Sequence, residues 1–141
     1  MLNTSLTADK TMDGLFNNEI KRTENRAIQG LESYTRDEIK TFVLEYIKEE
    51  LLTQGITDVS IKGIEIHGSR NRGTARADSD LDVVFEYEGD IREDDFFTML
   101  HDDDDPMYIE DVEVDINPIT EPLSEYMERS RAYDLQILRG V

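Results

Sequence analysis

The sequence predicts an α/β (α+β) domain in which helices alternate with short strands. Three observations predict it: a capped helix with one apolar stripe near residues 35–55, short segments in which apolar and polar residues alternate, and turn residues between these segments. The 141 residues are enough for one domain with its own apolar core. We expect this domain to span residues 34–141, with residues 1–33 forming an arm or helix of unassigned role.

The first helix is expected to begin after Thr35, whose hydroxyl can cap it while the Glu38 side chain reaches back to the backbone of Thr35. The apolar residues that follow recur at three- and four-residue steps and form one stripe: Ile39, Phe42, Val43, Tyr46, Ile47 and Leu51. Gly55 can adopt the left-handed conformation that ends a helix. The next extended segment changes register at Gly63, which indicates a bulge or turn, and its strand ends at His67.

Two more strands and two more helices complete the pattern. A strand is expected over residues 80–87, followed by a helix that Asp90 can cap. A third strand alternates over residues 112–116 and is expected to stop at Pro118. Pro122 is well placed in the first turn of a last helix.

The composition limits the chemistry that a site in this chain can use. There is no cysteine, and His67 and His101 are the two histidines, so a bound metal is expected to be an oxygen-preferring cation such as Mg²⁺, Mn²⁺ or Ca²⁺. The formal net charge of -18 disfavours an extended nucleic-acid footprint and binding to an anionic membrane. Because neither a secretory leader nor a long apolar stretch is recognisable, a cytoplasmic protein is expected.

Gly68, Ser69 and three aspartates form a candidate site for a polyphosphate and metal ions. Gly68 and Ser69 directly follow a strand, where glycine lets backbone amides approach a phosphate oxygen and the serine hydroxyl can donate to it. Asp80 and Asp82 are two residues apart in a strand and therefore project from the same face. Asp115, in a later strand, can complete a site for two metal ions.

Two assignments around these acids stay open. Glu113 lies on the same face as Asp115, so a change of register would exchange their roles. Arg70, Arg72 and Arg76 lie within seven positions of an otherwise acidic chain. They could contact a triphosphate or neutralise the nearby aspartates, and one or two of them would be enough for nucleotide contact.

The stretch HGSRNRGTARADSDLDVVFEY resembles the motif of the minimal nucleotidyltransferases in the DNA polymerase beta superfamily, which is Gly-Ser, ten residues, then Asp-x-Asp. The segment VEVDINPI looks like that family's third-carboxylate strand, and the order of elements agrees from about residue 35 to 118. The resemblance implies a polymerase-beta-like fold, a small mixed β-sheet with helices packed against it. It also implies that Gly68 and Ser69 bind phosphate, and that Asp80, Asp82 and Asp115 bind two Mg²⁺ ions, or Mn²⁺ in their place.

The expected activity is metal-dependent transfer of a nucleoside monophosphate, AMP from ATP by default, to an acceptor hydroxyl with release of pyrophosphate. The resemblance admits a small-molecule acceptor, a protein acceptor or a toxin-like partner, and the short chain favours a protein. The alternative is a catalytically silent, antitoxin-like or scaffold module. Residues 86–115 carry fourteen acids and the single base Arg92, which suits docking of a basic partner. The acidic run Asp102–Asp105 is expected to be a solvated turn.

Overall fold

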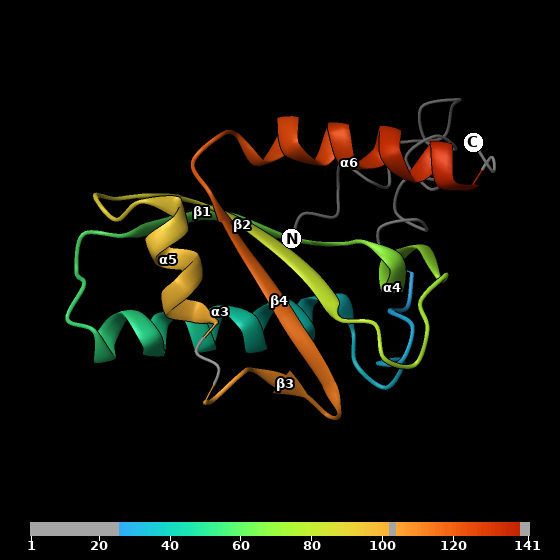
Figure 1. Ribbon diagram of the computed structural model, residues 1–141, viewed down its shortest axis with the longest axis horizontal. Coiled ribbons are helices and arrows are strands. Elements are labelled where there is room, and N and C mark those ends of the chain that lie inside the picture. The colour runs from blue at the N-terminus through green and yellow to red at the C-terminus, as the bar shows by residue number, and fades with distance from the viewer. Residues whose placement is uncertain (1–25, 102–103, 139–141) are drawn as a thin grey trace, which may run out of the picture.

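The computed structural model describes residues 26–101 and 104–138. Its elements are, in chain order, α3 (Arg36–Thr53), β1 (Ser60–His67), α4 (Ser69–Arg72), β2 (Leu81–Glu88), α5 (Glu93–Leu100), β3 (Tyr108–Ile109), β4 (Val112–Ile119) and α6 (Leu123–Leu138). The four strands form one sheet in the order β1-β2-β4-β3 (Figure 1). The expected α/β class, with a small mixed sheet and helices packed on it, is confirmed.

β2 lies between β1 and β4 in the sheet. β1 pairs with it antiparallel and β4 pairs with it parallel, while the short β3 pairs antiparallel with the beginning of β4. Parallel neighbours need a crossover connection, and α5 lies in the connection between β2 and β4. As a consequence, the beginning of β2 lies beside the first half of β4, and polar residues from two distant parts of the sequence become neighbours.

The two faces of the sheet have different coverings. α3 and α5 pack on one face, where their apolar side chains form the core with those of the strands, including Ile39, Val43, Ile47, Phe96, Leu100, Leu81, Val83 and Phe85. α6 lies on the other side of the strands (Figure 1). At its start the Leu123 N–H donates to Glu86 Oε1 at 2.9 Å. Since Asp82 and Glu86 are four residues apart in β2, they share the face that α6 covers.

The expectations for α3 and β1 are confirmed. The Glu38 N–H donates to Thr35 Oγ1 at 3.0 Å, and the Thr35 N–H donates to Glu38 Oε1 at 2.8 Å, which completes the capping box. The helix ends at Thr53, shortly before Gly55 with its φ of 72°. In β1 the register shifts at Gly63, so one strand with a bulge runs to His67.

Two expected boundaries were wrong. Asp90 does not cap α5: the N-cap is Arg92, and Asp90 lies in the preceding turn, where its N–H donates to Asp58 Oδ2 at 2.8 Å. Pro118 does not stop the third strand, since β4 continues to Ile119. β3 pairs with β4 no further than Glu113, so the outer edge of β4 at Pro118 has no partner strand in the described ranges, and the missing N–H removes no ladder bond there.

The described part of the N-terminal arm packs on the domain. Ile28 and Leu31 are buried in the core. Gln29 forms two hydrogen bonds with Ala75 in the loop after α4, donating from Nε2 at 3.0 Å and accepting at Oε1 at 2.8 Å. The apolar residues Met12, Leu15, Phe16 and Ile20 of the same arm lie outside the described residues. Among the helices that the structure describes, none has the length and apolar character needed to cross a bilayer.

Candidate active site

Gly68 forms the turn between β1 and α4. Its φ of 84° and ψ of -164° lie in a region that is essentially restricted to glycine. A Cβ atom at this position would collide with the Asp82 carboxylate. Glycine therefore allows the backbone of the turn to approach Asp82 closely, while Ser69 begins α4 directly after it.

Arg70 is turned into the protein and holds the loop together. Its side chain is buried, with 4% of the residue exposed. The guanidinium donates to the backbone oxygens of Gln29, Ser79 and Ala77 at 2.8, 2.9 and 3.2 Å. This geometry favours a structural role for Arg70 over contact with a nucleotide.

Replacing Arg70 with Met is expected to lower the free energy of unfolding by roughly 2–4 kcal/mol, because three carbonyl oxygens lose their charged donor. Thermal or denaturant unfolding measures the change. Arg76→Met is the matched control, since Arg76 is exposed, and it should shift stability by no more than about 0.5 kcal/mol. Equal stability of the two variants would contradict the structural role.

Arg72 is the arginine that faces the candidate site. It lines a pocket beside Gly68 and forms an ion pair with Asp134 of α6, with 2.8 Å between Nη1 and Oδ1. Arg76 is exposed, and it is its backbone N–H that bonds to Ser79 Oγ. Of the three arginines expected near a triphosphate, Arg72 therefore has the best position to contact one.

The carboxylates meet where β2 and β4 run side by side. Asp82 is directly opposite Asp115 in the parallel register, and His67 of β1 is opposite Asp82 on its other side. Asp80 lies one residue before β2 and is exposed. Burial, followed by the negative charges of Glu113 and Asp115, raises the pKa of Asp80. The register therefore places Asp115 beside Asp82, and Glu113 closer to Asp80.

Asp82 is in an environment that disfavours its negative charge. Burial, with the charges of Asp115 and Asp80 in addition, raises the pKa of Asp82 to about 6, while Arg72 acts in the opposite direction. A divalent cation between such carboxylates would remove their repulsion, and oxygen donors suit Mg²⁺ or Mn²⁺. Within the described residues, however, no three Asp, Glu, His or Cys side chains converge as a ready-made metal site.

The Asp115 carboxylate contacts His101 at the end of α5. Its Oδ1 is 3.0 Å from His101 Nε2, and the Ile116 N–H donates to the same nitrogen at 3.1 Å. The other ring nitrogen of His101 lies 2.7 Å from the backbone oxygen of Phe97. With 43% of its side chain exposed, Asp115 points out of the core. Asp82 and Asp115 thus fit a divalent cation in donor chemistry and strand position, and the His101 contact leaves Asp115 Oδ2 without a hydrogen bond to that ring.

The raised pKa of Asp82 predicts a pH-dependent stability that Mg²⁺ modifies. Below about pH 4 the carboxyl is protonated in both the folded and unfolded states, so this group has no effect. Between about pH 4 and pH 6 the unfolded chain ionises this carboxyl while the folded protein keeps it protonated, so stability falls, by on the order of 1 kcal/mol after solvent screening. Thermal unfolding should therefore show stabilisation by Mg²⁺ near pH 7.5 and much less near pH 5.

Asp82→Asn is the control for this pH effect. The variant has no charge to relieve, so its stability should vary less across this range and respond less to Mg²⁺. If Mg²⁺ stabilised the variant and the unaltered protein equally at both pH values, the cation would bind at a site that does not include Asp82.

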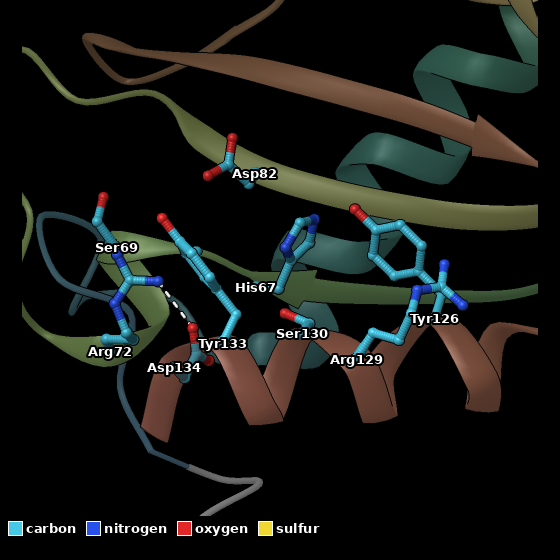
Figure 2. Close-up of a pocket in the computed structure, with 10 residues that line it drawn as sticks. His67, Ser69, Arg72, Asp82, Tyr126, Arg129, Ser130, Tyr133 and Asp134 are labelled. Atoms are coloured by element: carbon cyan, nitrogen blue, oxygen red, sulfur yellow. Dashed lines mark hydrogen bonds and ion pairs between the residues drawn. The ribbon is translucent and has the colours of Figure 1, made fainter. Parts of the chain in front are cut away.

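A pocket of about 440 Å³ opens beside the Gly68 turn, between the sheet and α6. Its lining falls into two groups (Figure 2). The sheet and the turn contribute His67, Gly68, Ser69, Arg72 and Asp82, and α6 contributes Tyr126, Arg129, Ser130, Tyr133 and Asp134. The α6 residues recur at three- and four-residue steps and therefore lie on one face of the helix.

The sequence predicted no functional role for Tyr126 and Tyr133, which lie on α6. Their signal was a helical stripe that combines aromatic with charged and hydroxyl side chains, which is unusual for a helix that only completes a core. On the sheet side of the same pocket, burial lowers the pKa of His67, so that its imidazole is neutral at neutral pH.

Comparison with known proteins gives one match. The sequence model of the nucleotidyltransferase domain family matches residues 44–133, which include the Gly68 turn, the three aspartates and most of α6. No curated protein and no solved structure matches the chain.

Proposed function

Because this chain belongs to the nucleotidyltransferase domain family, we propose that it transfers a nucleoside monophosphate, AMP from ATP, to an acceptor hydroxyl in an Mg²⁺-dependent reaction. The observation that carries the proposal is the pairing of Asp82 with Asp115 across two parallel strands, directly beside a glycine turn that borders a pocket. Carboxylates that can hold divalent cations beside a phosphate group support this reaction, because phosphoryl transfer depends on positioning and on stabilisation of charge.

Each side chain has a role in this proposal. Ser69 and Arg72 bind the β- and γ-phosphates, and Asp80, Asp82 and Asp115 would hold Mg²⁺. When bound, Mg²⁺ supplies positive charge against the oxygens of the reacting phosphate. The acceptor oxygen bonds to the α-phosphorus, the bond from that phosphorus to the β-phosphate oxygen breaks, and pyrophosphate leaves. Asp115, whose side chain is 43% exposed, accepts the proton of the acceptor hydroxyl.

The test uses ATP labelled at either the α- or the γ-phosphate, with Mg²⁺ and candidate protein or small-molecule acceptors. Label from the α-phosphate should appear on the acceptor, and label from the γ-phosphate should appear in pyrophosphate. Transfer of the γ-label would indicate a kinase-like reaction and contradict the proposal. A protein acceptor is the first choice because the described chain has little structure beyond the sheet, its helices and the pocket wall.

A silent partner-binding module is the second candidate. It is favoured by the Asp115–His101 contact and by the lack of a converged metal cluster in residues 26–101 and 104–138. This candidate predicts that a basic or toxin-like partner binds equally well with and without ATP, and that neither label moves.

A further inference from the structure

Two aromatic rings form a corner in the pocket, with His67 near the middle of the view in Figure 2 and Tyr126 toward one end. His67, the last residue of β1, and Tyr126 in the first turn of α6 have ring centroids 5.4 Å apart and planes at 81° to each other. We call this pair the aromatic corner. The Arg129 guanidinium carbon lies 5.6 Å from the centroid of the Tyr126 ring. Arg129 also donates two hydrogen bonds of 2.8 Å to the Glu121 carboxylate, which hold the guanidinium beside this ring.

The phosphate-binding groups lie at the opposite end of the pocket. In Figure 2, Ser69 and Arg72 lie at one end of the view, Tyr126 and Arg129 at the other, and Asp82 lies over the space between them. A triphosphate that runs from Ser69 to Asp82, as in the proposed function, therefore directs its nucleoside toward the aromatic corner.

The acceptor has a different route to the site. Asp82 lines the pocket, whereas Asp115 does not, although the two residues are opposite each other in the sheet. An acceptor hydroxyl that is deprotonated by Asp115 approaches from the Asp115 side and leaves the pocket to the nucleotide. The volume of about 440 Å³ is within the range of small-molecule sites.

We propose that the aromatic corner and Ser130 of α6 are the nucleoside-binding subsite of this chain. The base packs against the rings of His67 and Tyr126, since aromatic side chains stack with any nucleobase. Ser130 lines the same pocket, and its hydroxyl has no hydrogen-bond partner among the described residues, so it is available to a ribose hydroxyl. The position of the triphosphate comes from the proposed function, on which this subsite rests. The subsite gives a ligand to the pocket-lining face of α6, which is not part of the Gly-Ser and Asp-x-Asp motif.

Binding of two probes separates the subsite from the phosphate site. The affinities of a non-hydrolysable ATP analogue and of inorganic tripolyphosphate are measured calorimetrically in the presence of Mg²⁺. Tyr126→Leu should weaken binding of the ATP analogue about tenfold, because the base loses an aromatic ring on which to stack. The affinity for tripolyphosphate, which has no base, should stay within about twofold of the unaltered protein.

Two further variants control for folding. Tyr126→Phe keeps the ring and should bind the ATP analogue within about twofold of the unaltered protein. Leu135→Ala changes an α6 residue that is 52% exposed and does not line the pocket, and it should leave both affinities unchanged. Melting temperatures of all variants are compared in parallel.

The outcomes are distinguishable. Unchanged affinity of Tyr126→Leu for the ATP analogue would overturn the subsite and leave the proposed function standing. Equal weakening for the ATP analogue and tripolyphosphate would also overturn it, since the residue would then act on the whole pocket. If the unaltered protein binds neither probe, the proposed function and the subsite both fail.

Discussion

Asp82→Asn is expected to reduce the rate of nucleotide transfer at least about a hundredfold, because in the proposed function it removes a carboxylate that would hold a cation beside the reacting phosphate. Asp82 is the acid that both borders the pocket and pairs with Asp115, so no other described carboxylate has its position. The measurement is the initial rate of transfer from α-labelled ATP at saturating nucleotide and Mg²⁺.

Unfolding would not explain such a loss. Burial and neighbouring charges raise the pKa of Asp82, so a neutral amide at this position should leave the metal-free protein at least as stable as before. Glu88→Gln is a matched control on the same strand: its carboxylate, with 72% of the side chain exposed, pairs with Lys62 far from the pocket. A rate for Asp82→Asn as high as that of Glu88→Gln would contradict the role of Asp82.

Gly68→Ala is expected to abolish detectable transfer and to lower stability by roughly 2–4 kcal/mol. The backbone conformation at Gly68 is unfavourable for any residue with a Cβ, and that atom would meet the Asp82 carboxylate. Relief of the collision must move either the turn or Asp82, and both are part of the proposed site. Transfer assays and thermal unfolding measure the two effects.

Gly73→Ala separates backbone strain from the collision. Gly73 also has a positive φ, 82°, at the end of α4, but a Cβ atom there would have no neighbour within 4 Å. Its substitution should lower stability by about 1 kcal/mol and leave transfer intact. If both glycine variants retained transfer equally, close approach of the Gly68 turn to Asp82 would not be needed for activity.

Local signals in the sequence predicted the elements that depend on neighbouring residues. The capping box at Thr35 and Glu38 and the bulge at Gly63 involve residues within a few positions of one another, and the structure has both. The alternation in β2 likewise put Asp82 on the face opposite the core residues Leu81 and Val83. These features follow from backbone periodicity and side-chain chemistry alone.

The features that sequence reasoning missed depend on distant partners. Pro118 is tolerated inside β4 because β3 ends early, and β3, with two residues, has too little sequence to show an alternation. Similarly, the contact of His101 with Asp115 and the pocket wall on α6 require the packing of helices against a particular strand. The sequence alone does not show which of Arg70 and Arg72 could contact a ligand. In the fold, the Arg70 side chain is buried, whereas Arg72 lines the pocket.

The central claim is that Asp82 and Asp115 hold a cation that bridges to a nucleotide in the pocket. A crystal structure with Mn²⁺ and a non-hydrolysable ATP analogue tests it directly through the anomalous signal of the metal. We predict a metal peak between the two carboxylates, with the triphosphate on Ser69 and Arg72. A bound nucleotide with no metal peak at Asp82 and Asp115 would contradict this claim.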